Sequence, residues 1–116
     1  MFTVQLIESD AQRRSLYTAK LAENGISIVD GPEAAGANLV LASVTDPDIT
    51  RRVNEVRELR HRFPNSAIAV ITQYLTNLFI HRVCYHADVV FSTQATEKDD
   101  DSWTDFAIKL RRVTRE

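Results

Sequence analysis

Short apolar runs alternate along this chain with longer stretches in which apolar residues recur every three or four positions. A short apolar run is typical of a buried strand, and the wider spacing is typical of an amphipathic helix. The pattern predicts five strands, at residues 4–7, 26–29, 39–42, 67–71 and 89–91. It predicts helices at about residues 11–24, 48–63 and 76–86 and from residue 102, with room for little more than one turn at 32–37.

Residues at the predicted helix ends support these boundaries. Asp10 can cap the first helix by accepting a backbone hydrogen bond, and Gly25 follows that helix where a left-handed residue is favoured. The first helix is expected to bury Leu16, Ala19 and Leu21. The spacing in the last helix predicts a buried stripe made of Trp103, Phe106, Ala107, Leu110 and Val113.

Five alternations of strand and helix predict one doubly wound α/β domain over residues 1–116. Such alternation implies right-handed crossovers and a parallel sheet covered on both faces. Sites in sheets of this type form at the carboxyl ends of the strands. Polar residues stand at these ends, and they are Glu8, Ser9, Asp10, Ser43, Thr72 and Thr93.

Composition narrows the class of protein. The net charge is −2, so the chain as a whole is not a polycation of the kind that binds nucleic acid. Cys84 is the one cysteine, which excludes an internal disulfide and a cysteine zinc cluster and fits a reducing cytoplasm. No apolar run approaches the ~20 residues of a membrane span, and residues 1–5 lack the features of a signal peptide. We expect a cytoplasmic protein without a membrane partner.

Four segments in order resemble the receiver domain of bacterial response regulators. They are residues 4–10, 39–48, 67–72 and 86–94. The first is similar to the strand that carries two magnesium-binding acids, and the second to the phosphoacceptor strand and its Pro-Asp loop. The third is similar to the strand that ends in a hydroxyl residue, and the fourth to the Gly-Ala-Asp segment and the strand that ends in Lys-Pro. The resemblance implies a flavodoxin-like, five-stranded parallel sheet of strand order 2-1-3-4-5, here with a shortened second helix.

This sequence departs from the family at the positions that carry its chemistry. Glu8 keeps the first acidic place, but Ser9 replaces the second acid and Ser43 replaces the phosphoacceptor aspartate. Thr72 keeps the hydroxyl, and Thr93 stands where the lysine belongs. A serine cannot form the acyl phosphate of a receiver. Magnesium needs several oxygen ligands, and a single carboxylate supplies too few of them. We therefore expect a pseudo-receiver with no catalytic activity, no metal and no cofactor.

The expected function is a phosphorylation-independent module for signalling and protein interaction. Ser9, Ser43, Thr72 and Thr93 are expected to hydrogen-bond one another and hold one conformation. If Asp10 pointed into the pocket it would add an acid without restoring the nucleophile or the lysine. One alternative is a receiver that still responds to phosphorylation, for example at Ser43, or to a small ligand. A flavodoxin-like enzyme domain is another, against which the missing Gly-rich phosphate loop and acid–base pair argue.

An apolar cluster in and around the predicted fourth helix is the candidate interaction surface, although part of it is expected to be core. It comprises Tyr74, Leu75, Phe79, Ile80, Tyr85 and Val90. Val90 also takes the family's aromatic switch position. The resemblance implies a homodimer or partner contact through the fourth helix, fifth strand and fifth helix. It also implies an effector in a longer parent protein, such as a transcription regulator.

Three further features favour structural roles over binding or catalysis. Residues 48–63 are rich in arginine, but Glu55 and Glu58 are interleaved, so we interpret this helix as a solvated face and do not expect direct nucleic-acid binding. Cys84 is expected to be a small buried hydrophobe. His81 and His86 do not share a helix face at the spacing of a metal pair.

Overall fold

The computed structural model describes residues 2–30, 36–93 and 100–114. The strands are β1 (Phe2–Ile7), β2 (Ile26–Val29), β3 (Leu39–Ser43), β4 (Ala67–Thr72) and β5 (Val89–Ser92). The helices of the described part are α1 (Ala11–Glu23), α2 (Ile49–Arg62), α3 (Asn77–Val83) and α4 (Asp100–Val113). All neighbouring strands pair in parallel, in the order β2-β1-β3-β4-β5. The predicted fold class and strand order are confirmed.

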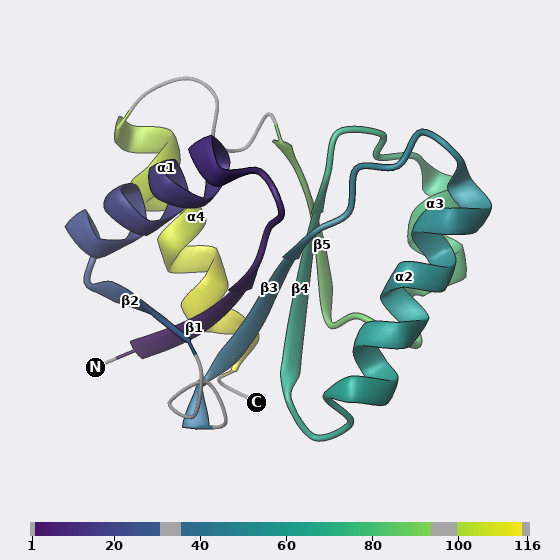
Figure 1. Ribbon diagram of the computed structural model, residues 1–116, viewed down its shortest axis with the longest axis horizontal. Helices are drawn as coiled ribbons and strands as arrows, with labels where there is room; N and C mark the ends of the chain where they lie inside the picture. The colour runs from purple at the N-terminus through teal and green to yellow at the C-terminus, as the bar shows by residue number, and fades with distance from the viewer. Residues whose placement is uncertain (1, 31–35, 94–99, 115–116) are drawn as a thin grey trace.

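The helices form two layers, with α1 and α4 on one face of the sheet and α2 and α3 on the other (Figure 1). Because successive strand residues point to opposite faces, each central strand contributes to both layers. Leu39 and Leu41 pack in the core beneath α1 and α4, whereas Val40 and Ala42 pack beneath α2 and α3. Both faces of β3 are thus buried, which explains its uninterrupted apolar sequence.

Aromatic rings join α1, α4 and β5 in the first layer. The Tyr17 and Trp103 rings meet edge to face with centroids 5.4 Å apart, and Phe91 and Phe106 do the same at 4.9 Å. Such pairs contribute about 0.5–1.5 kcal/mol beyond the area that they bury. The predicted stripe of α4 is confirmed, since Trp103, Phe106, Ala107 and Leu110 are buried and Val113 is partly buried.

The prediction for the inner face of α1 is wrong in part. Leu16 is 48% exposed and Ala19 is also exposed, whereas Tyr17 and Leu21 are buried. The stacking of Tyr17 on Trp103 fixes the rotation of the helix about its axis. Leu21, one turn later, then faces inward as predicted, and Leu16 turns toward solvent.

Both long crossover helices of the central strands begin at an aspartate cap. Asp10 accepts from the Gln12 amide at 2.9 Å, and Asp48 accepts from the Thr50 amide at 2.8 Å. Each bond satisfies one of the free N–H groups at a helix start. Gly25 has a φ of +78°, which confirms the predicted left-handed residue after α1.

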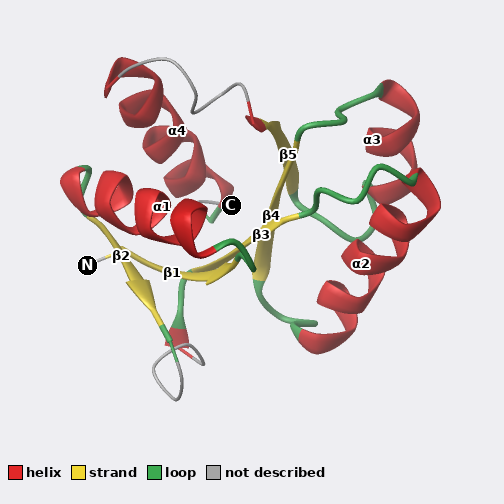
Figure 2. Cartoon of the chain, turned by 45° about the horizontal axis from the view of Figure 1, so that its top comes forward, coloured by secondary structure: helices red, strands yellow, loops and turns green. Residues whose placement is uncertain are grey.

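The described residues of the connection between β2 and β3 are residue 30 and residues 36–38. Most of the expected short second helix, residues 32–37, lies outside the described residues, and residues 36–38 add no α-helix. Asn38 anchors the return to the sheet, because its amide donates to the Thr3 carbonyl at 2.9 Å. Within the described part of the chain, the side of β1 and β2 opposite α1 has no helix over it (Figure 2). No described helix combines the length and apolar character that a membrane crossing requires.

Candidate functional site

The carboxyl ends of β1, β3, β4 and β5 meet at one edge of the sheet, at the top of Figure 1. Register fixes their relative heights, since Ile7 pairs with Ala42, Ser43 with Ile71, and Thr72 with Ser92. The fold therefore brings the predicted polar positions to a common edge, although their side chains do not form one network.

Glu8, the first residue after β1, has a buried carboxylate. Its side chain is 5% exposed, and Oε1 lies 3.9 Å from an Arg13 guanidinium nitrogen. Oε2 accepts a long hydrogen bond of 3.4 Å from the Asp10 amide, while Oε1 has no hydrogen-bond partner among the described residues. Ser9 and Asp10 are exposed, and the Asp10 carboxylate caps α1. Glu8 thus faces Arg13, and Asp10 adds no acid to the pocket.

Ser43 ends β3 with a buried hydroxyl. Its Oγ has no hydrogen-bond partner within the described residues. The strand ladder continues past it, because the Val44 amide donates to the Ile71 carbonyl at 2.9 Å. The bonding expected among Ser9, Ser43, Thr72 and Thr93 is therefore wrong for Ser43, because its hydroxyl bonds to none of the other three. An unmade bond of this kind costs about 1–3 kcal/mol.

Thr72 is fully buried and is held by Arg52, a residue whose role the sequence analysis missed. Arg52 is 3% exposed. One of its guanidinium nitrogens donates to the Tyr74 carbonyl at 2.7 Å and to the Thr72 hydroxyl at 3.4 Å. The same hydroxyl accepts from the Tyr74 amide at 3.3 Å. The guanidinium lies 4.6 Å from the centre of the Phe79 ring and 5.3 Å from that of Tyr74.

This arrangement, which we call the Arg52 clamp (Arg52, Thr72, Tyr74 and Phe79), fixes the loop between β4 and α3. Its contacts tie α2 to the last residue of β4 (Thr72), to Tyr74 in the loop and to Phe79 in α3. The sequence did carry a signal for it, because Arg52 stands four positions before Val56 and so shares the apolar face of α2. Interpreting the arginines of this helix as uniformly solvated was wrong.

Arg60 is a second inward-facing arginine of α2. Its Nε donates to the His86 carbonyl and one Nη to the Ser66 carbonyl, both at 2.9 Å. The other Nη pairs with Asp88 at 3.2 Å, and Asp88 also accepts from the Ile68 amide at 2.7 Å. Arg60 therefore joins the end of α2 to the segments that lead into β4 and β5.

The predicted interaction surface divides into core and exposed residues. Phe79 is fully buried, so its assignment to a contact surface is wrong, because it packs against Arg52 and the core beneath α2. Leu75 and Val90 are partly buried against that core. The exposed members are Tyr85 at 87%, Ile80 at 41% and Tyr74 at 37%, and α3 adds Leu78 at 50%.

Cys84 is exposed, contrary to prediction. Helix α3 ends at Val83, which is fully buried, and Cys84 is the C-cap that follows it. The Cys84 thiol donates to the His81 carbonyl at 3.1 Å. Because the helix ends before Cys84, its side chain turns away from the core that Val83 enters.

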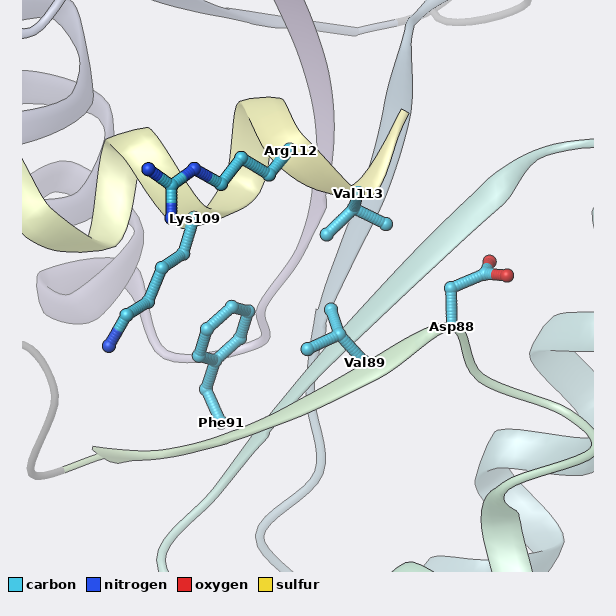
Figure 3. A pocket seen from close by; sticks show the side chains of 6 residues that line it. All are labelled: Asp88, Val89, Phe91, Lys109, Arg112 and Val113. Atoms are coloured by element: carbon cyan, nitrogen blue, oxygen red, sulfur yellow. The ribbon is translucent and has the colours of Figure 1, made fainter. Parts of the chain in front are cut away.

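A hollow of about 330 Å³ lies between β5 and the last turns of α4 (Figure 3). Val89 and Phe91 form its apolar floor, and Lys109 and Arg112 extend from α4 above it. The Asp88 carboxylate points away from α4, consistent with its pairing to Arg60. The hollow thus combines apolar and basic groups beside the edge strand of the sheet.

No group of three or more His, Cys, Asp or Glu side chains suited to a metal ion occurs within residues 2–30, 36–93 and 100–114. The buried carboxylate of Glu8 faces Arg13 at 3.9 Å, and Asp10 and Asp48 cap helices. Asp46 accepts from the Asp48 amide and pairs with Arg51. Magnesium takes several oxygen ligands, most often carboxylates. Within the described residues, hydrogen bonds and the Arg52 clamp hold the side chains at these strand ends.

The strand order and helix layers define a flavodoxin-like α/β fold of the receiver type. No protein-family model and no curated protein matches the sequence. Among solved structures, a response regulator from Thermotoga maritima has a TM-score of 0.66 at 16% identity, covering 100% of this chain and 99% of that one. The receiver domain of a Francisella response regulator has a TM-score of 0.69 at 14% identity, covering 99% and 100%.

A putative pilus assembly protein from Burkholderia thailandensis is also similar, with a TM-score of 0.73 at 12% identity and 100% coverage of both chains. Identities this low establish the shared fold alone. The neighbours include response regulators and a pilus assembly protein, so this fold serves proteins of more than one description.

Proposed function

We propose that this chain is a receiver-fold signalling and protein-interaction module that works in the cytoplasm without aspartyl phosphorylation and without catalysis of its own. The proposal rests on what stands at the ends of β3 and β4, where the family that the chain resembles binds a phosphoryl group. Ser43 stands at the end of β3, and the Thr72 hydroxyl is bonded to Arg52. The similarity to response-regulator receivers supports the signalling class.

The chemistry at Ser43 supports independence from phosphorylation. Phosphoryl transfer to a receiver requires a carboxylate nucleophile and a magnesium ion that neutralises the developing charge. Ser43 offers a hydroxyl, and its buried Oγ has no base among its hydrogen-bond partners in the described residues. Glu8 is the buried acid at this edge, and its carboxylate lies beside Arg13.

The Arg52 clamp supports a single conformation in place of a switch. In the family that the chain resembles, a hydroxyl at the position of Thr72 contacts the phosphoryl group. Here that hydroxyl accepts from both Arg52 and the Tyr74 amide. Moving it would break both of these hydrogen bonds, while Arg52 itself is held in place by its 2.7 Å bond to the Tyr74 carbonyl and by the Phe79 ring.

We propose that the output surface consists of α3, β5 and α4, through which the chain contacts itself or a partner protein. Leu78, Ile80 and Tyr85 expose large apolar side chains there. The hollow lined by Phe91 and Arg112 continues the surface on the other side of β5. Exposed apolar patches bordered by charge are typical of protein contacts. In a longer parent protein, we propose that this surface regulates a joined effector such as a DNA-binding domain.

The proposal is tested by incubating the protein with acetyl phosphate and magnesium and measuring its intact mass. We expect no phosphoryl adduct on the wild type and none on Ser43→Ala. An adduct on the wild type that Ser43→Ala abolishes would show a receiver that responds through Ser43 and would refute the proposal. A typical receiver treated in parallel controls for the reagent.

A further inference from the structure

A groove of about 230 Å³ lies between α2 and the carboxyl ends of β1 and β3. Ile7, Ala42 and Leu59 contribute its apolar lining. The groove lies on the α2 side of the sheet, away from the hollow between β5 and α4. The groove is separate from the proposed output surface of α3, β5 and α4, although Ser43 of the candidate site also lines it. Its test measures peptide binding, so a negative result would leave the phosphorylation test of the proposed function unaffected.

The groove borders a sheet face that is open in the described part of the chain. Val4 and Leu6 point toward α1 and are buried, so Thr3, Gln5 and Ile7 point to the opposite side and are only partly buried. No described helix lies over that side of β1 (Figure 2). A parallel sheet is ordinarily covered by helices on both faces, and the described residues supply no helix for this face of β1.

Two carboxylates form one wall of the groove. Glu55 and Glu58 lie one turn apart on α2, and both line the groove and are exposed. Neither belongs to any ion pair found among the described residues. Burial and then the charge of Asp46 raise the pKa of Glu55, with Arg52 offsetting part of the shift. The wall thus carries two carboxylates without an ion-pair partner among the described residues.

Arg62 also lines the groove, at the end of α2. Its guanidinium lies 5.1 Å from the centre of the Phe63 ring. It forms no described ion pair with Glu58, but its charge lies at the same groove and offsets at most one of the two carboxylates.

We propose that this groove docks an amphipathic helix of a partner protein, with apolar residues against Ile7, Ala42 and Leu59 and with Lys or Arg side chains against Glu55 and Glu58. A helix bound here would cover this face of β1. In helix-in-groove binding, apolar residues at successive turns of the helix contact the groove. The two carboxylates select a basic helix by charge complementarity. Docking of this groove on a different surface of a second copy would be a heterologous contact, which generates either a closed ring or an open chain of subunits.

The test is an NMR titration of the full chain with two synthetic helical peptides. Both carry leucine at every third or fourth position, flanked in one by lysine and in the other by glutamate. We expect the lysine peptide to cause saturable amide shifts centred on Ile7, Ala42 and Leu59. The glutamate peptide is expected to cause none there.

Charge reversal gives the decisive variant. E55K/E58K is expected to weaken lysine-peptide binding by about threefold to tenfold, as for the loss of two exposed ion pairs, and to bind the glutamate peptide instead. E23K/D105K is the matched control, because it makes the same change in net charge on exposed residues of α1 and α4. It is expected to bind like the wild type.

Three outcomes would overturn the inference. One is an absence of saturable shifts at the groove with the lysine peptide. Another is equal weakening by the matched control, which would show attraction to net charge alone. The third is concentration-dependent shifts at the groove without peptide, which would show that a second copy is the occupant.

Discussion

Replacing Arg52 by leucine is expected to destabilise the fold by about 2–3 kcal/mol. The substitution removes a charge-assisted bond to the Tyr74 carbonyl, worth about 1.5–3 kcal/mol, together with stacking on Phe79 and Tyr74 worth about 0.5–2 kcal/mol. It also leaves the buried Thr72 hydroxyl with one fewer donor. Relief of the buried charge and of the unpaired Nε offsets part of this loss.

The assay is urea unfolding of Arg52→Leu, Arg52→Lys and the control Arg57→Leu. Arg57 is exposed on the same helix, so its substitution is expected to change stability by less than about 0.5 kcal/mol. Lysine keeps the charge but not the planar guanidinium, and Arg52→Lys should lie between the wild type and Arg52→Leu. If Arg52→Leu matches Arg57→Leu, the clamp contributes nothing and the argument for one fixed conformation is refuted.

Three more substitutions are informative. Ser43→Ala should leave stability unchanged or raise it by up to about 1 kcal/mol in urea unfolding, because it removes a buried hydroxyl without a described partner; a loss above about 1 kcal/mol would contradict this. Gly25→Ala should cost about 1–2 kcal/mol, because φ is +78° and the new Cβ would lie 2.8 Å from an Arg111 nitrogen; an unchanged midpoint would count against it. Tyr85→Asp should abolish any self-association seen by sedimentation equilibrium, and Leu16→Asp should not; equal effects would exclude a specific α3 surface.

Much of the fold follows from local pattern. Strands such as β4 are continuous apolar runs because helices cover both of their faces. The aspartate caps and Gly25 then mark the ends of α1 and the start of α2. The rotation of α1 was not predictable from periodicity, since it depends on the contact of Tyr17 with Trp103, far away in the sequence. Contacts between residues distant in the sequence therefore determine which face of α1 is buried.

The site was predictable in position but not in bonding. The ends of parallel strands necessarily meet, so Glu8, Ser43 and Thr72 could be placed at one edge. Which side chain bonds to Thr72 depends on how α2 crosses β4, and Arg52 was therefore missed. Phe79 was taken for a surface residue because it lies among apolar neighbours, and only the packing of α3 on α2 shows it to be core.

The most direct test of the central claim is thermal unfolding with and without magnesium and beryllium fluoride, which together imitate an aspartyl phosphate. We predict an unchanged midpoint, because Ser43 offers no carboxylate and Arg52 holds Thr72 in place. The unfolding midpoint of a domain of this size rises by roughly 4–8 °C for each ~1 kcal/mol by which a ligand stabilises the fold. A rise of several degrees would show that the pocket binds a phosphoryl group and would contradict the account.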